Sequence, residues 1–528
     1  MRRLLLAAAM ALPLSAPPTV WAQSDPNVIR VAPAGDLRVL DPIWTSAAIT
    51  LNHGQMIYDV LLTTDSKLNP QPQMAEGWTV SDDRLTWTFT LRPGLAFHDG
   101  TPVTAEDVVA SIRRWAVRVT PGQLLFSRVK SFTATGPRTL VLELKEQFGP
   151  VLEALSSPVL APFIMRAADA ATDPFQQVRT TVGSGPYRFE TSEHRQGDRV
   201  VYTRNPAYVP REGAPDGYAG AKIAHIPRVE WVYLPDQTTQ TQAIIKGEID
   251  VIETLQSDLV ALLRRNRDVV VRVLNTTGSI GHIRPNTLQP PFNHPKARQA
   301  LLALINQDDY IAATAPDPSM GQPCRSLFTC GTPLESNVGL EPFARPNPER
   351  ARALLAEAGY RGEPVVLLDP ADQPAIHAIA LVTADALRRI GVNVQVETMD
   401  WSSKVTRRNN KGPVGPGLQG WNLAFTTWGG FTFASPLTNT PLVSSCDGRN
   451  MYGWPCDEDM ERLRGAYLNA QTPEAQREVV EALQRRYLEM VPYVNTGIFQ
   501  QASAWRRELS GLRATFYPVY WNVQRAAR

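Results

Sequence analysis

The sequence predicts an α/β protein with two or three domains. The chain has 528 residues, several times the roughly 150 residues of an average domain. In residues 180–275 and again in 281–398, strand patterns alternate with helix patterns, which favours parallel sheets covered by helices on both faces. In residues 85–92, apolar residues alternate with Thr and Arg, a period of two that indicates an antiparallel strand with one buried face.

The other expected elements follow from periodicity and from capping residues. Thr104 is placed to cap a helix whose first turn holds Glu106 and Asp107. Glycines mark the ends of three further helices. Strands are expected at 28–31, 85–92, 139–144, 187–190, 199–203, 228–234, 364–368 and 392–398, and helices at 51–62, 238–246, 295–305, 348–358, 374–390, 457–469 and 473–489.

The first 22 residues have the pattern of an export signal. Arg2 and Arg3 precede an apolar run of residues 4–14, and Val20 and Ala22 supply small residues at the -3 and -1 positions of a cleavage site. We therefore expect a mature chain that starts near Gln23, exported and soluble. Because no cysteine precedes Cys324, we expect no N-terminal lipid anchor. A buried N-terminal helix is the alternative.

Four cysteines are expected to form two local disulfides, Cys324 with Cys330 and Cys446 with Cys456. An even number of cysteines in an exported chain favours disulfides, and local pairs demand least from the fold. Zinc is the alternative, but the spacings do not fit the usual C-x2-4-C ligand pattern. We expect no metal site and no cofactor.

Charge and motifs exclude several function classes. The chain has 53 Lys and Arg against 51 Asp and Glu and no basic stripe, so we expect no nucleic-acid partner. The sequence lacks a Walker loop, an H-E-x-x-H motif and a G-x-S-x-G motif. The G-x-G-x-x-G at 415–420 contains a proline and follows no strand, and His98 beside Asp99 has no accompanying nucleophile, so both are interpreted as structural.

Several segments together resemble the extracellular solute-binding proteins of ABC transporters, family 5, which include dipeptide- and oligopeptide-binding proteins. The resemblance covers essentially the whole mature chain. It rests on AEGW at 75–78, LTWTFTLR at 85–92, FHDGTPVTAEDV at 97–108, GSGPY at 183–187, KGEID at 246–250, PKARQAL at 295–301 and VPY at 491–493.

The resemblance implies a two-lobed periplasmic binding protein (type II, cluster C) with an extra inserted α+β domain. It implies a monomer that captures a peptide or small-molecule ligand between its lobes and delivers it to an ABC permease, without being an enzyme. Two crossovers, near 275 and 490, would form the hinge. The expected parts are a signal peptide at 1–22, lobe I at 23–60, 180–275 and 490–528, an inserted domain at 61–179, and lobe II at 276–489.

The candidate ligand-binding residues lie where strands of lobe II end, because ligands of open α/β lobes lie beyond the carboxyl ends of strands. Aromatic rings supply contact area with few rotatable bonds, and an aspartate can hold a cation. Core packing for the tryptophans, and capping or solvated roles for the charges, are the alternatives. The candidates are Trp428, Gly429, Phe431, Thr432, Trp401, Asp400, Asp369 and Arg284.

The cargo stays open between a peptide-like solute and a non-peptide such as a sugar oligomer, an opine or a metal chelate; a periplasmic hydrolase is disfavoured. The family's dipeptide receptors resemble one another in an aspartate after the lobe II Trp-Gly segment and an arginine upstream. Here these positions fall on Phe431 and on or near Asp369. We therefore expect a free dipeptide to bind poorly in that pose. A longer or blocked peptide, or an uncharged or cationic solute stacked on Trp401, Trp428 and Phe431, fits better.

Overall fold

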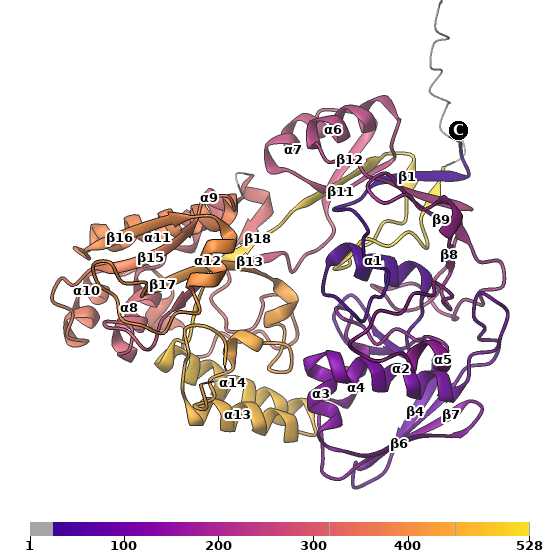
Figure 1. Ribbon diagram of the computed structural model, residues 1–528, viewed down its shortest axis with the longest axis horizontal. Coiled ribbons are helices and arrows are strands. Elements are labelled where there is room, and N and C mark those ends of the chain that lie inside the picture. Colours follow the sequence, from indigo (N-terminus) through magenta and orange to yellow (C-terminus); the bar gives the residue numbers. More distant parts are fainter. Residues whose placement is uncertain (1–24, 316, 449, 527–528) are drawn as a thin grey trace, which may run out of the picture.

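The computed structural model describes residues 25–315, 317–448 and 450–526, so the expected export signal lies outside the described residues. Two sheets with covering helices form two lobes, and a third sheet forms an extra domain below lobe I (Figure 1). We call the part built on the seven-stranded sheet lobe I and the part built on the six-stranded sheet lobe II. Within the described ranges, no helix has both the length and the apolar character needed to cross a membrane.

Lobe I is built on a sheet with the strand order β12-β19-β11-β1-β10-β9-β8. Strand β1 runs parallel to β10 and β11, and the other pairs are antiparallel. Helix α1 packs on one face, and α6 and α7 pack on the other. The bounds are β1 (Val28–Ala32), β8 (Tyr187–Phe189), β9 (Arg199–Arg204), β10 (Arg228–Val232), β11 (Val251–Leu255), β12 (Val269–Val273), β19 (Ala502–Arg506), α1 (Ala48–Ile57), α6 (Gln237–Lys246) and α7 (Ser257–Arg264).

Lobe II is built on a sheet with the order β14-β18-β13-β17-β15-β16. Strand β15 is parallel to β16 and β17, whereas β13 is antiparallel to β17 and β18. The bounds are β13 (Ser279–Pro285), β14 (Gly321–Gln322), β15 (Val365–Pro370), β16 (Val394–Met399), β17 (Leu423–Gly429), β18 (Val494–Phe499), α8 (Pro295–Leu304), α9 (Gln307–Thr314), α10 (Pro348–Glu357), α11 (Pro374–Arg389), α12 (Trp401–Arg407), α13 (Glu458–Asn469) and α14 (Pro473–Met490).

The expectation of parallel sheets is wrong in part, because both sheets are mixed. The expected second crossover near 490 also shifts: β18 pairs with β13, so the chain stays in lobe II until Phe499. The chain enters lobe II on β13 and leaves it on β18, and because these neighbouring strands run in opposite directions, both crossovers lie at the same edge of the sheet.

The extra domain has an antiparallel sheet in the order β4-β5-β7-β6. The alternation along 85–92 is confirmed: Trp87, Phe89 and Leu91 are buried between half-buried threonines. Thr104 caps α2 through a capping box with Asp107, as expected. The bounds are β4 (Ala75–Val80), β5 (Thr86–Leu91), β6 (Val129–Gly136), β7 (Thr139–Leu144), α2 (Ala105–Arg118), α3 (Thr120–Phe126), α4 (Val151–Ser156) and α5 (Ala167–Ala170), with short strands elsewhere at β2 (Leu62–Thr64), β3 (Pro70–Pro72), β20 (Leu509–Ser510) and β21 (Gln524–Arg525).

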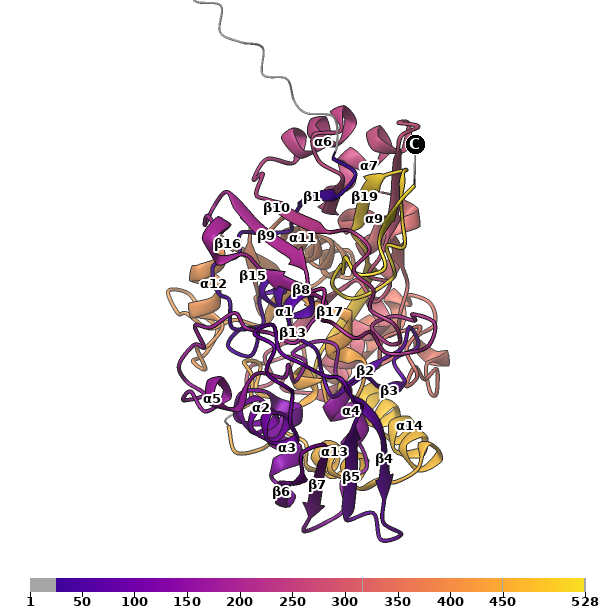
Figure 2. The same cartoon turned by 90° about the vertical axis from the view of Figure 1, so that its right-hand side faces the viewer.

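The extra domain also contacts lobe II, far along the chain. Figure 2 shows its sheet at the base of the molecule, next to α13 and α14. The backbone N–H of Gly149 donates to the carbonyl oxygen of Leu468 at 2.8 Å. Glu153 of α4 accepts hydrogen bonds from the hydroxyls of Ser435 and Tyr467. We call this contact between α4 and α13 the distal contact.

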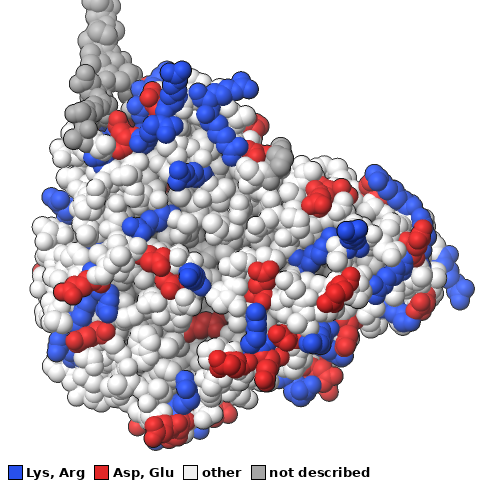
Figure 3. Space-filling model, turned by 180° about the vertical axis from the view of Figure 1, so that it is seen from behind, with Lys and Arg blue, Asp and Glu red and all other residues white. Residues whose placement is uncertain are grey.

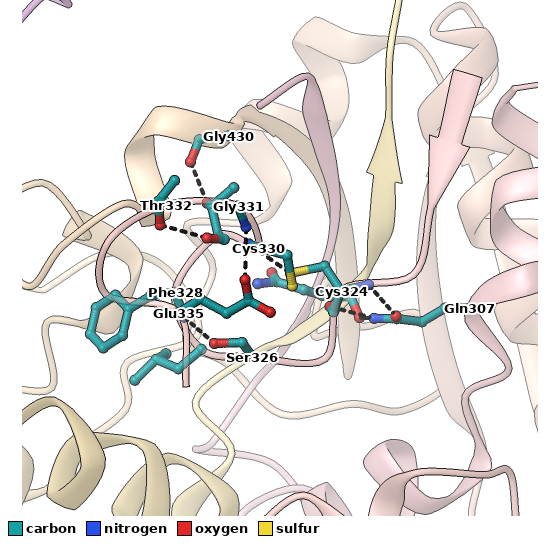
Figure 4. Close-up of a disulfide and its surroundings, with 12 residues drawn as sticks. Gln307, Cys324, Ser326, Phe328, Cys330, Gly331, Thr332, Glu335 and Gly430 are labelled. Atoms are coloured by element: carbon teal, nitrogen blue, oxygen red, sulfur yellow. Dashed lines mark hydrogen bonds between the residues drawn. A yellow bond between two sulfur atoms is a disulfide. The ribbon is translucent and has the colours of Figure 1, made fainter. Parts of the chain in front are cut away.

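Both expected disulfides are present, Cys324–Cys330 and Cys446–Cys456, which excludes the zinc alternative for these cysteines. The first closes a short loop that lies against Gly430 (Figure 4). Within that loop, the Thr329 hydroxyl donates to the Gly430 carbonyl oxygen at 2.5 Å.

The two segments that resemble functional motifs, His98 with Asp99 and the G-x-G-x-x-G at 415–420, lie in places that suit a structural role. The ring of His98 accepts a hydrogen bond from the Gly183 N–H and contacts the Gly185 carbonyl oxygen, and burial lowers its pKa to about 4. Residues 415–420 form a loop that opens no helix. On the molecular surface, Lys and Arg are interspersed with Asp and Glu over the face in Figure 3.

Candidate ligand-binding site

A cavity of about 790 Å³ lies between the two lobes. Its walls come from lobe I, from the extra domain, from lobe II and from the first crossover, residues 274–278. Ligand pockets commonly have volumes of about 300–1,000 Å³ and occur where domains meet. We call this cavity the cleft.

The lobe II wall of the cleft begins where β17 ends. Trp428, Gly429, Phe431 and Thr432, four of the predicted residues, line the cleft, together with Gly430. They lie in sequence after the buried first half of β17, at the carboxyl end where the strand leaves the sheet. The sequence argument about strand ends therefore leads to the cleft for this segment.

Gly430 fixes this wall against the first crossover. Its N–H donates to the carbonyl oxygen of Gly278 at 2.8 Å. A Cβ at position 430 would lie 2.1 Å from the carbonyl oxygen of Thr277, which is far too close. Only a residue without a side chain allows this approach, so glycine at 430 is a packing requirement.

Aromatic rings contact each other across the cleft. Phe431 of lobe II meets Phe516, from the C-terminal segment that packs on lobe I, with ring centroids 5.0 Å apart and planes at 71°. Such edge-to-face pairs are favourable beyond the area that they bury. The indole N–H of Trp428, on the same wall, is buried without a hydrogen-bond partner.

The lobe I wall carries an acidic group, Glu253 of β11, which is 5% exposed. Its Oε1 accepts hydrogen bonds from Asn52 Nδ2 at 2.8 Å and from the Tyr520 hydroxyl at 2.7 Å. Its Oε2 accepts from the Ala34 N–H at 3.0 Å. Asn52, of α1, also lines the cleft and is 2% exposed, and its Oδ1 has no partner.

Burial raises the pKa of Glu253 to about 7, although its three hydrogen-bond donors act in the opposite direction. Three titratable groups near it have pKa values outside the neutral range in the native state. Burial lowers the pKa of His53, next to Asn52, to about 3, and it raises the pKa values of Tyr202 and Tyr520 well above 10. Glu253 thus changes charge near neutral pH while these neighbours do not.

The structure places Asp369 and Asp400 outside the residues that line the cleft. Asp369, at the end of β15, is fully buried and accepts from the His377 ring at 2.7 Å and from the Thr398 hydroxyl at 3.1 Å. Asp400 caps α12 and accepts from the Ser403 N–H at 3.0 Å. Local partners therefore occupy both carboxylates: Asp400 has the capping role given as an alternative, whereas Asp369 is buried against His377 and neither caps a helix nor faces solvent.

Trp401 and Arg284 also lie away from the cleft lining. The Trp401 ring lies under the Lys404 ammonium, with Nζ 4.5 Å from the ring centroid. Arg284 is fully buried, and its guanidinium donates to the carbonyl oxygens of Tyr452 and Pro441. An arginine enclosed by backbone carbonyls positions the loop around Tyr452 and does not face the cavity.

Sequence reasoning missed Glu253, Asn52 and Phe516. An available signal was Glu253 within the mainly apolar segment VIETL at 251–255, since buried carboxylates are rare without a function or a partner. The other two had no local signal. Among the described residues, no three His, Cys, Asp or Glu side chains gather as a metal site would require.

Comparison with known proteins agrees with this architecture. The family model of bacterial extracellular solute-binding proteins, family 5 (middle), matches residues 69–440. A probable peptide ABC transporter periplasmic-binding protein of Sinorhizobium fredii is 38% identical over 522 residues, which cover 97% of each chain.

Solved structures of the same architecture bind different solutes. The dipeptide-binding protein of Pseudoalteromonas sp. SM9913, in complex with Met-Leu, superposes with a TM-score of 0.74 at 20% identity, covering 94% of this chain and 100% of that one. The binding protein AgaA of A. tumefaciens R10, in complex with agropinic acid, gives a TM-score of 0.71 at 20% identity, covering 95% and 99%.

The family match spans well over half of the chain, and the relative from S. fredii spans nearly all of it. Members of this family bind peptides or other small solutes and work with ABC permeases, and they are not enzymes. The chain belongs to family 5 of the bacterial extracellular solute-binding proteins.

Proposed function

We propose that this protein is the receptor of an ABC importer and captures a peptide or peptide-like solute in the cleft. The observation that carries the proposal is a cavity of about 790 Å³ walled by both lobes. A solute in that cavity touches both lobes at once, so its binding energy depends on how the lobes are arranged. The relationship to the peptide-binding protein of S. fredii supports peptide cargo.

Capture works by closure about the two crossovers. A ligand that contacts both lobes favours the closed form through its higher affinity for that form. The permease then recognises the closed shape, and no covalent chemistry takes place. The crossovers are short, residues 274–278 and 500–501, and the Gln500 side chain donates to the Thr276 carbonyl oxygen at 2.7 Å.

We further propose that the chain is exported, that cleavage occurs before Gln23, and that the mature protein works in the periplasm as a monomer without a lipid anchor. The twin arginines, the apolar run and the Val20-Trp21-Ala22 site support export. The two disulfides fit an oxidising compartment.

The residues favour cargo other than a zwitterionic dipeptide held in the manner of the family's dipeptide receptors. At the position expected for an ammonium-binding aspartate, Phe431 lines the cleft. The second candidate function is capture of a non-peptide solute on the same fold. The lining is neutral apart from Glu253 and includes the rings of Trp428, Phe431, Phe516 and Tyr517, which favours such a solute. The AgaA complex with agropinic acid is an example of this architecture with a solute of that kind.

Mass spectrometry of material released by denaturing the natively purified protein tests the cargo. We expect peptides or blocked peptides, and recovery of only a non-peptide solute would establish the second candidate instead. Small-angle scattering with the recovered solute tests the mechanism. Saturation should reduce the radius of gyration, and an unchanged radius would contradict capture by closure.

A further inference from the structure

The acceptor atoms at the lobe I wall outnumber the donors that the protein supplies. A carboxylate offers about four lone-pair sites, and three donors reach Glu253, from Asn52, Tyr520 and Ala34. The amide oxygen of Asn52 offers two more sites, and no donor reaches it. The orientation of that amide is fixed, because its nitrogen donates to Glu253.

The two residues that carry these acceptors are buried and line the cleft. Asn52 is 2% exposed and Glu253 is 5% exposed, and both line the cleft. A buried acceptor without a donor is costly, so such a group in a ligand cavity indicates a donor on the ligand. A primary ammonium group carries three donors and one positive charge, which matches one open site on Glu253 and two on Asn52.

No other charged side chain among the described residues that line the cleft would compete for a ligand's ammonium group or repel it. Among the described residues that line the cleft, Glu253 is the carboxylate, and no Lys, Arg or His is present. The opposite wall offers the faces and edges of Trp428 and Phe431, which tolerate a cation and stack on apolar groups. A ligand carboxylate would find no cationic side chain in this lining.

We propose that Glu253 and Asn52 form the anchor for a cationic nitrogen of the cargo, so that the cleft selects solutes with one ammonium group and no free carboxylate. This inference rests on the proposed receptor function and narrows its cargo class. The anchor lies on lobe I, whereas Trp428 and Phe431 lie on lobe II, so a solute that contacts the anchor and these two rings must bridge the lobes.

The test uses four probes that differ only in their ends: Phe-Leu, Phe-Leu amide, N-acetyl-Phe-Leu and N-acetyl-Phe-Leu amide. Each is titrated calorimetrically at pH 8 into the mature protein, into Glu253→Gln and into the control Glu248→Gln. The Glu253→Gln substitution keeps the shape of the side chain and removes its charge. Glu248 precedes the same strand and does not line the cleft.

We expect Phe-Leu amide to bind at least about tenfold more tightly than its acetylated form. Glu253→Gln should abolish that preference, and Glu248→Gln should retain it. Equal affinity for the free and acetylated amides would overturn the anchor while leaving peptide capture intact, as would a preference that survives in Glu253→Gln.

A second measurement covers the case in which no peptide binds. Thermal melting with benzylamine, and with benzyl alcohol as its neutral counterpart, compares the wild type with Glu253→Gln. If benzylamine stabilises the wild type but not Glu253→Gln, the result supports the anchor and contradicts peptide cargo. If benzylamine shows no dependence on Glu253, the anchor is overturned. Melting curves without probes show whether Glu253→Gln is folded.

Discussion

The two walls of the cleft are built from different chemistry. Lobe II presents aromatic, glycine and hydroxyl groups, mainly from residues 428–432, with further lining residues at 437–440. Lobe I presents a carboxylate, an amide and hydroxyls from segments that are far apart in the chain, among them those of Asn52, Glu253 and Ser503. Both walls supply aromatic contact area, because Phe516 and Tyr517 lie on the lobe I side, but the carboxylate lies on the lobe I wall alone.

This difference shows how a receptor of this kind divides affinity from selectivity. Aromatic surfaces accept many solutes with similar energies, whereas a buried acid discriminates by charge. Substitutions on the two walls should therefore have different effects on the protein, and the following predictions distinguish these effects.

The largest effect is expected from Glu253 and the dependence of stability on pH. The unfolded carboxyl has a pKa near 4.5 and the folded one about 7, so the native state holds the proton more tightly. The stability contributed by this group is complete below pH 4.5 and is lost as the pH rises through 7, by about 3 kcal/mol. The Glu253→Gln variant has no carboxyl group at this position, so its free energy of unfolding should not fall for this reason as the pH rises.

Urea denaturation of both proteins at several pH values from 4.5 to 7.5 measures this pH-dependent difference in the free energy of unfolding. The free energy of unfolding of Glu253→Gln relative to the wild type should rise by about 3 kcal/mol over that range. In the native state His53, Tyr202 and Tyr520 keep one protonation state over this range, and the titration of unfolded His53 is common to both proteins and cancels in the comparison. Parallel curves for the two proteins would contradict the raised pKa.

On the lobe II wall, Gly430→Ala should destabilise the protein by about 1–3 kcal/mol, because its Cβ would press against the Thr277 carbonyl oxygen. Gly429→Ala is the matched control. A Cβ at 429 meets nothing within 4 Å, and φ is -60°. Thermal or urea unfolding should separate the two variants, and equal stabilities would show that the crossover yields to the added methyl group.

The contact between the walls should be worth about 1 kcal/mol. A double-mutant cycle of Phe431→Ala and Phe516→Ala, followed by urea denaturation, measures the coupling free energy. Phe175 is 64% exposed on the extra domain, so Phe431→Ala and Phe175→Ala should be additive. Additivity of the first pair would mean that the rings do not contact each other in the ligand-free protein.

The smallest effect is expected at the distal contact. Glu153→Gln keeps the shape of the side chain but weakens its hydrogen bonds to the Ser435 and Tyr467 hydroxyls, at a cost of about 1 kcal/mol or less. The ligand-free protein should then show a larger radius of gyration by small-angle scattering. Glu478→Gln, on the exposed face of α14, should leave it unchanged. An unaltered radius in both would show that this contact does not hold the lobes together.

The sequence could predict local features but not contacts that form across the chain. Helix α11, strand β7 and the Thr104 cap follow from patterns within a few residues. The antiparallel return of β18 onto β13 joins segments about 200 residues apart, and it appears in no local pattern.

The same limit applies to the candidate site. Residues 428–432 form one segment at a strand end and could be found. Asp369 and Asp400 also follow strands, but neighbours within 30 positions occupy their carboxylates. Glu253 lies within a strand, and its exposure to the cavity depends on α1 and on the C-terminal segment around Tyr520. A sequence pattern does not reveal which acids remain without local partners.

The two crossovers lie side by side along their whole length. Val273 pairs with Ala502 at the lobe I end, and Ser279 pairs with Phe499 at the lobe II end. Two short linkers that lie side by side are suited to a rotation of one lobe against the other, which is the motion that the proposed closure requires. One donor and acceptor dye pair, attached to the extra domain and to α13, would then read the occupancy of the whole molecule. If the lobes close as proposed, the receptor is a scaffold for an optical sensor of its own cargo.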